Sequence, residues 1–185
     1  VLINTAGPAL TAFPIADPPE ICRGETVTVS ANAAGGGGTY TYEWTSDPPG
    51  FISDQPVFSQ SPVTTIRYDL KLTDEYNNLF TGHINVIVNP LPVIDLIPDN
   101  ITPINTDSIV VCVRDSVMLD AGFDNDPAGT TYFWNQNFEN RLYRASTNGN
   151  WIEFQTHSVL VTNGISGCQN TGKITIIFDF NQCAI

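Results

Sequence analysis

Two short stretches of this chain, Tyr40-Thr41-Tyr42-Glu43-Trp44 and Thr130-Thr131-Tyr132-Phe133-Trp134, share one pattern. In each of them, a tyrosine is followed two positions later by a tryptophan. Side chains two positions apart lie on the same face of a β-strand, so this spacing places the aromatic rings together on one side. Each stretch therefore predicts a strand whose inner face ends in a buried tryptophan.

The two stretches belong to an internal repeat with an offset of 90 positions, which is the separation of Trp44 and Trp134. Other pairs matched at this offset are Cys22 with Cys112, Ala31 with Ala121, Tyr42 with Tyr132, Leu70 with Leu160 and Gly82 with Gly172. A repeat this long indicates a duplicated domain and not a solenoid. The sequence predicts one domain over residues 1–90 and a second over residues 91–185.

Further alternating runs follow the first tryptophan, at Ile66–Leu72 and Ile84–Val88, and segments rich in Gly, Pro, Asn and Asp separate such runs. Short strands with these turns, and no room for a long helix, are typical of β-sandwiches. The predicted fold class is all-β, with two tandem immunoglobulin-like β-sandwich domains. We expect Trp44 and Trp134 in the two cores, whereas Trp151 has no counterpart in the first half and is the one tryptophan that could be exposed for binding.

The composition limits the partners of the chain. Its 185 residues include 19 acidic and 7 basic side chains, for a formal net charge of −12. No nucleic acid is expected as a partner, because phosphate contacts need clustered Lys and Arg. No apolar run approaches the roughly 18 residues that a membrane-spanning helix needs, so no membrane insertion is expected.

The residues that could support catalysis do not form a recognisable motif. His83 and His157 both lie in predicted strands, and Gly35–Gly38 is not followed by the Lys and helix of a phosphate-binding loop. A nucleophile, base and acid cannot be assembled from the spacing of Ser, His and Asp. We therefore predict that the chain is not an enzyme and that it has no catalytic or cofactor-binding residues.

Calcium is the one metal ion for which the sequence offers ligands. Asp124-Asn125-Asp126, with Asp95, Asp99 and Asp107, supplies the oxygen atoms that calcium prefers. The spacing does not match an EF-hand, and turn-forming Asp and Asn explain these loops equally well. No metal site is predicted, and calcium remains a hypothesis.

One run of the first half, Cys22-Arg23-Gly24-Glu25-Thr26-Val27-Thr28-Val29 followed by Tyr40–Trp44, resembles the PKD-like and immunoglobulin-like modules of secreted and cell-surface proteins of Bacteroidota. The second half resembles them through Val111-Cys112, Tyr132–Trp134 and Ser166-Gly167-Cys168. The resemblance implies an extracellular or cell-surface module that acts in adhesion or as a spacer. Its expected partners are a protein or glycan at the cell surface, or copies of itself.

Two alternative functions stay open. The chain could be a structural subunit of an extracellular filament, assembled by donation of its apolar N-terminal stretch, Val1–Ile3 and Ala9–Ile15, or by a disulfide between subunits. The stretch could equally be the first edge strand of its own domain. The third function is that of an accessory module of a larger secreted enzyme.

The four cysteines include no C-x-x-C pair, which favours at least one disulfide in an oxidising compartment. The resemblance implies a bond between Cys112 and Cys168, because related modules join a cysteine before the second strand to one in the last hairpin. The sequence leaves three fates open for the other two. Cys183 could pair with Cys112 instead, Cys22 and Cys183 could join successive subunits, or both could be free thiols.

Overall fold

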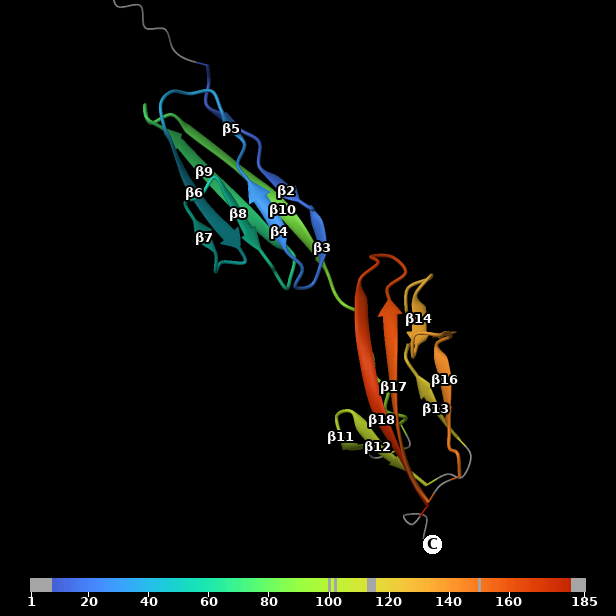
Figure 1. Ribbon diagram of the computed structural model, residues 1–185. Coiled ribbons are helices and arrows are strands. Elements are labelled where there is room, and N and C mark those ends of the chain that lie inside the picture. Colours follow the sequence, from blue (N-terminus) through green and yellow to red (C-terminus); the bar gives the residue numbers. More distant parts are fainter. Residues whose placement is uncertain (1–7, 100, 102, 113–115, 150, 181–185) are drawn as a thin grey trace, which may run out of the picture. The chain divides into compact units, whose positions relative to one another are not determined.

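The computed structural model describes residues 8–180 except 100, 102, 113–115 and 150. The chain divides into two compact units, residues 1–90 and 91–185. The regular elements of both units, β1 to β18, are all strands (Figure 1). Among the described residues, no helix has the length and apolar character needed to cross a membrane.

Unit 1 is a two-layer sandwich. Its large sheet has the strand order β3-β10-β9-β6-β7, and its small sheet has the order β2-β4-β8. The strands are β1 (Thr11–Ala12), β2 (Ile15–Asp17), β3 (Glu20–Cys22), β4 (Val27–Ser30), β5 (Ala33–Ala34), β6 (Tyr40–Asp47), β7 (Ile52–Ser53), β8 (Val57–Gln60), β9 (Ile66–Asp74) and β10 (Leu79–Asn89). The chain passes from the small to the large sheet at Pro18 and Pro19, where no backbone N–H is available to continue a ladder. The next strand, β3, runs parallel to β10.

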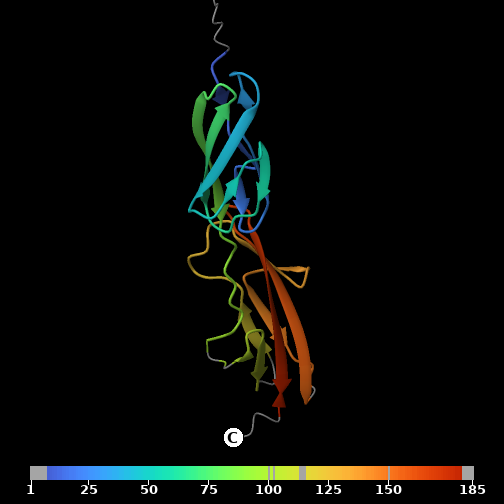
Figure 2. The same cartoon turned by 90° about the vertical axis from the view of Figure 1, so that its left-hand side faces the viewer.

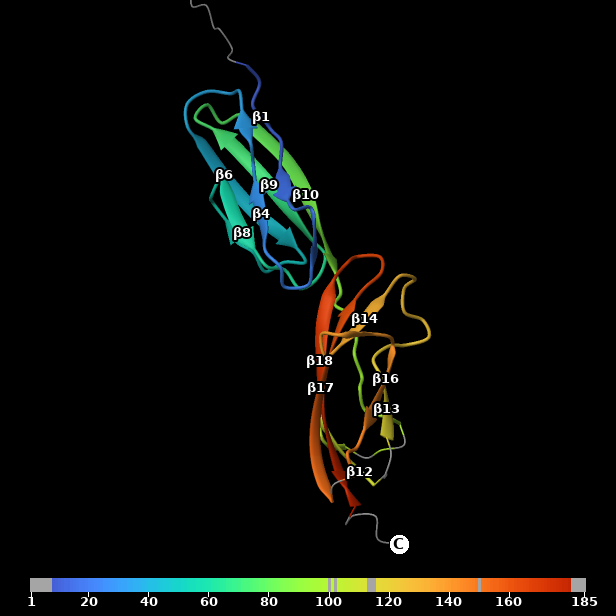
Figure 3. The same cartoon turned by 45° about the vertical axis from the view of Figure 1, so that its right-hand side comes forward.

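Unit 2 has the same arrangement. Its large sheet has the order β11-β12-β18-β17-β14-β15, and β13 and β16 form a second sheet. The strands are β11 (Pro103–Asn105), β12 (Ser108–Val111), β13 (Ser116–Asp120), β14 (Thr131–Trp134), β15 (Phe138–Glu139), β16 (Leu142–Ser146), β17 (Ile152–Thr162) and β18 (Gln169–Asp179). As in unit 1, an early strand, β12, runs parallel to the last one, β18. The long pair β17 and β18 lies on one side of the unit, and β13 with β16 lies on the other (Figure 3). The same long pair is drawn in orange and red in Figure 2.

Each unit packs around its own fully buried tryptophan. Trp44 and Trp134 are both 0% exposed. The indole N–H of Trp44 donates to the carbonyl of Gln55 at 3.1 Å, and that of Trp134 donates to the carbonyl of Asn140 at 2.9 Å. The same side chain is therefore held in the same way in both cores, so the two units are built on one plan.

The offset of 90 does not hold along the whole repeat. Trp44 faces Leu70 on the neighbouring strand, and Leu70 is 2% exposed. Trp134 faces Val159 and not Leu160, and Val159 is 0% exposed. Because adjacent residues of a strand point to opposite faces, Leu160 lies on the outside of its sheet. The match of Leu70 with Leu160 is therefore wrong by one residue in this strand.

The apolar N-terminal stretch pairs within unit 1. Residues Thr11–Ala12 form a ladder with Ala33–Ala34, and Ile15–Asp17 pairs with residues 28–30 of β4. The part of the stretch that the structure describes is thus an edge strand of its own domain. This corrects the alternative in which Ala9–Ile15 is donated to another subunit, while Val1–Ile3 lies outside the described residues.

Candidate functional site

An acid-lined cavity of about 310 Å³ opens on unit 2. Its charged walls are Asp95, Asp99, Asp120, Asp124 and Arg141. Three of these acids were candidate calcium ligands from the sequence, so the structure does bring part of that set together. Neither Asp120 nor Arg141 was identified from the sequence, because both come from strand ends that are distant in the chain.

Among the described residues, Arg141 is the one cation that lines this cavity, and two carboxylates hold its guanidinium group. Arg141 donates from Nε and Nη2 to the two carboxylate oxygens of Asp120 at 2.7 and 2.8 Å, and from Nη1 to Asp124 at 2.9 Å. Burial raises the pKa of Asp120, but the hydrogen bonds from Arg141 and from the Gly122 N–H outweigh it and leave the pKa below its ordinary value. All three side-chain nitrogens of Arg141 are therefore committed, two to Asp120 at the end of β13 and one to Asp124 in the loop that follows.

Two further candidate calcium ligands, Asp126 and Asp95, accept hydrogen bonds that hold nearby backbone or side chains in place. Asp126 accepts a hydrogen bond from the Tyr132 hydroxyl and another from the Phe123 N–H at 2.7 Å. Burial and the nearby Asp126 raise the pKa of Tyr132 to about 12. Asp95 accepts the Ile97 N–H at 3.2 Å. In the described part of the chain, no group of three or more His, Cys, Asp and Glu side chains is placed to hold a metal ion. Calcium binding stays a hypothesis.

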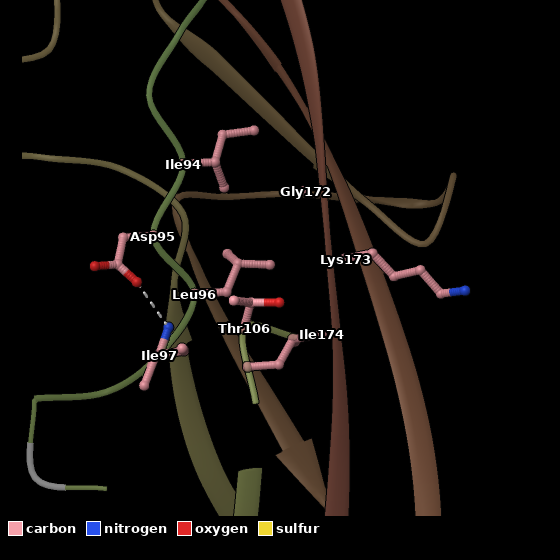
Figure 4. Close-up of a pocket in the computed structure, with 8 residues that line it drawn as sticks. All are labelled: Ile94, Asp95, Leu96, Ile97, Thr106, Gly172, Lys173 and Ile174. Atoms are coloured by element: carbon pink, nitrogen blue, oxygen red, sulfur yellow. Dashed lines mark hydrogen bonds between the residues drawn. The ribbon is translucent and has the colours of Figure 1, made fainter. Parts of the chain in front are cut away.

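A smaller hollow of about 90 Å³ lies between β18 and the segment Ile94–Ile97 (Figure 4). Ile94 and Leu96 point toward β18, and a Cβ on Gly172 would lie 2.6 Å from a methyl group of Ile94. Lys173 points away from this segment. The segment thus covers the inner face of β18, and the hollow is a by-product of core packing and is too small for an ordinary ligand.

The buried polar centre of unit 2 is His157 on β17, which is 7% exposed. Its Nδ1 lies 3.2 Å from Nδ2 of Asn135, and its Nε2 lies 3.1 Å from Oε1 of Gln155. An amide NH₂ can only donate and an amide oxygen can only accept, so these partners fit a neutral ring protonated at Nε2. Burial lowers the pKa of His157. His83, in contrast, is exposed on β10.

We expect His157 to make unit 2 sensitive to mild acid. Because its folded pKa lies below the ordinary value of about 6.5, its neutral form supports folding above that pH, and this support is lost as the pH falls toward the folded pKa. Urea unfolding between pH 7.5 and 5 should show the loss. His157→Gln should flatten the profile and His83→Gln should not, whereas equal profiles for all three proteins would contradict the assignment.

The described cysteines are all disulfide-bonded: Cys22, Cys112 and Cys168. Cys22 is therefore neither a free thiol nor a bridge to a second subunit, which corrects those two alternatives. Cys183 lies outside the described residues, so its predicted states stay predictions.

The predicted bond between Cys112 and Cys168 is wrong. Cys112 follows Val111, which pairs with Phe178 near the end of β18, whereas Cys168 directly precedes the start of that strand. Ten residues of strand separate Cys168 from Phe178, a distance of about 33 Å. Disulfide-bonded Cα atoms lie only about 4–7 Å apart.

Two facing sheets, with an early strand parallel to the last and a buried tryptophan on a central strand, define the immunoglobulin-like class of all-β sandwiches. No family model matches the sequence, and neither does any curated protein. The chain spans between half and two thirds of the length of the first two solved structures in the comparison.

Three solved structures illustrate the likeness. A carbohydrate-binding module of the β-sandwich superfamily is 14% identical over 82% of this chain and 54% of that chain, with a TM-score of 0.41. A bacterial ice-binding adhesin is 14% identical over 92% and 65%, with a TM-score of 0.39. The N-terminal Ig1-2 module of the Drosophila receptor protein tyrosine phosphatase DLAR is 10% identical over 93% and 98%, with a TM-score of 0.36. Likenesses at this level concern the fold alone.

Proposed function

We propose that the chain is a non-catalytic adhesion or spacer module of a bacterial surface protein, located outside the cell. The observation that carries this proposal is the disulfide bonding of Cys22, Cys112 and Cys168 in a tandem of immunoglobulin-like units. Disulfides persist in oxidising compartments and are rare in the cytosol. Each unit also has its own tryptophan-centred core, so each holds its shape without a ligand.

The roles of the ionisable side chains support a non-catalytic function. Three ionisable side chains of unit 2 use their hydrogen bonds to hold loops in place: Asp120, Arg141 and Tyr132. The net charge of −12 supports solubility outside the cell. The proposed partners are a protein or glycan at the cell surface.

Adhesion is tested with beads that carry the oxidised chain and are added to bacterial and host cell surfaces. We expect retention by one class of surface, and loss of retention after the chain is unfolded by reduction and heat. Removing the disulfides should lower the free energy of unfolding by about 2–4 kcal/mol for each bond. Retention equal to that of uncoated beads on every surface would contradict an adhesive role.

The filament alternative is separated by light scattering of the oxidised and the reduced chain. We expect the mass of a single chain in both states, because the described N-terminal strands pair inside unit 1 and Cys22 is bonded within the chain. A mass that grows with protein concentration, or one that falls on reduction, would favour a filament subunit and contradict the spacer proposal.

A further inference from the structure

The outer face of the large sheet of unit 1 is a charged surface. Arg67 lies 3.5 Å from Asp47 and 3.0 Å from Asp69, and Lys71 lies 2.6 Å from Glu43. These side chains project from alternate positions of β6 and β9, opposite to the buried core residues. The solvent-exposed face of this sheet therefore carries ion pairs, and polar side chains are usual on a solvated sheet face.

The corresponding face of unit 2 is formed by alternate residues of β17 from Ile152 to Thr162 and of β18 from Thr171 to Asp179, with neighbours on β12 and β14. We call it the outer face of unit 2. Its members alternate with buried residues such as Val159 and Ile176. Figure 4 shows one of its members, Lys173, pointing away from the side chains that fill the core.

One position pair shows the contrast between the two faces. Next to Trp44, Glu43 faces Lys71 across the strands, whereas next to Trp134, Phe133 faces Leu160. The ion pair of unit 1 is thus replaced by an apolar pair at the same place of the same fold. Because the scaffold is shared, strand geometry cannot explain the replacement.

The replacement continues along the strands. Arg67 faces Asn85 in unit 1, and the equivalent pair in unit 2 is Thr156 with Thr175, whose hydroxyl oxygens lie 3.3 Å apart. Beyond this pair, Phe154 faces Ile177. Where the central rows of unit 1 carry carboxylate and guanidinium groups, the equivalent rows on the outer face of unit 2 carry hydroxyl and apolar groups.

The outer face of unit 2 carries exposed rings at two places. Phe154 is 69% exposed and Phe133 is 36% exposed. Leu160, which faces Phe133, stands six residues from Phe154 on β17, a distance of about 20 Å along the strand. A belt of short hydroxyl side chains, including Thr156, Ser158 and Thr175, lies between the two places. Each place therefore offers an exposed ring next to an aliphatic side chain, Phe154 facing Ile177 and Phe133 facing Leu160.

We propose that the outer face of unit 2 binds a neutral glycan, an inference that rests on the proposed adhesive function. Sugar rings present C–H faces that stack on phenyl rings, and their hydroxyl groups can exchange hydrogen bonds with the belt. A glycan chain is long enough to reach from Phe154 to Phe133, and the strand rows between them form an open surface without a charged pair.

The negative net charge of the chain favours a neutral glycan over an anionic partner. A second copy of the chain would bring another net charge of −12, and an anionic glycan or nucleic acid would meet the same repulsion. Lys173 is the cation of the central rows, and it stands beside Ser158. A neutral, polyhydroxylated partner avoids the repulsion and matches the hydroxyl belt.

The test uses the full oxidised chain and titration calorimetry with neutral hexasaccharides (cellohexaose, xylohexaose and mannohexaose), with hexagalacturonate as the anionic probe. We expect binding of at least one neutral probe and none of the anionic one. Phe154→Ala should weaken binding by roughly tenfold or more, because one stacking ring is lost. The control Ile87→Ala, which removes a 48% exposed residue from the same face of unit 1, should leave binding unchanged.

A second variant grafts the charged pair of unit 1 onto unit 2. Phe133→Glu with Leu160→Lys places an ion pair where the same fold already carries Glu43 and Lys71, so we expect folding to be retained and glycan binding to be lost. Binding that survives both this variant and Phe154→Ala would overturn the assignment of the face.

Cell-surface retention separates this inference from the proposed function. If the chain is retained on cells but binds no neutral probe, or binds only hexagalacturonate or a protein, the glycan inference fails and the adhesive function stands. If retention also fails, the adhesive function on which this inference rests fails with it.

Discussion

Replacing Trp134 with alanine lowers the free energy of unfolding of unit 2 by about 3–5 kcal/mol, and Trp44→Ala has the same effect on unit 1. Both indoles are 0% exposed, so each substitution leaves a cavity that the sandwich cannot close completely. Each also removes the N–H that the carbonyl of Asn140 or Gln55 accepts, which adds an unsatisfied polar group. Denaturant unfolding followed by circular dichroism measures the loss.

The third tryptophan is the matched control. Trp151 directly precedes β17 and is 72% exposed. Trp151→Ala should therefore change the free energy of unfolding by no more than about 0.5 kcal/mol. Similar losses for Trp151→Ala and Trp134→Ala, or a negligible loss for Trp134→Ala, would contradict the tryptophan-centred core.

Asp74→Asn produces the second large effect, a fall of the melting temperature of unit 1 on the order of 10 °C. Asp74 is 5% exposed, and its carboxylate accepts the N–H groups of Gly37, Tyr76 and Asn78 at 2.8–3.0 Å, together with the Asn78 side-chain amide at 2.8 Å. An asparagine turns one acceptor oxygen into a donor, which then faces another donor. The substitution therefore frees the glycine loop from the β9–β10 turn.

The same residue sets a response to strong acid. The hydrogen bond from the Asn78 side chain, with those from three backbone N–H groups, lowers the pKa of Asp74. Its contribution to stability is present above the ordinary pKa of about 4 and is lost as the pH falls through the lower folded value. Asp69→Asn, on the exposed face beside Arg67, is the control and should leave both the melting temperature and its acid dependence nearly unchanged.

The sequence was informative where strand periodicity and the repeat agreed. Alternation around Trp44 and Trp134 predicted the all-β immunoglobulin-like fold, because a period of two is a property of the strand itself. The hydrogen bonds by which Asp74 holds two loops together could not be predicted from the sequence. Gly37, whose N–H donates to Asp74, lies 37 residues away in the chain and is brought close only by the fold. Arg141 was not identified beside the candidate calcium ligands for the same reason, because it lies 17 residues from Asp124 in the chain.

The cysteine prediction failed because spacing does not reveal the length of a strand. Cys168 was placed correctly at a hairpin, but the eleven residues of β18 carry the chain to the opposite end of the sheet, where Cys112 lies. The outer face of unit 2 was also hidden in the sequence. Phe133 and Leu160 follow apolar neighbours, so the pattern does not show which residues point outward until the register of β14 and β17 is known.

Hydrogen exchange of the full-length Trp44→Ala chain, followed by mass spectrometry, tests most directly whether each unit is stabilised by an interior of its own. The account predicts that amides of β9 and β10 exchange on the order of 100-fold faster, while those of β17 and β18 keep the protection of the unsubstituted chain. Equal loss of protection in all four strands would show one shared cooperative core and contradict the account.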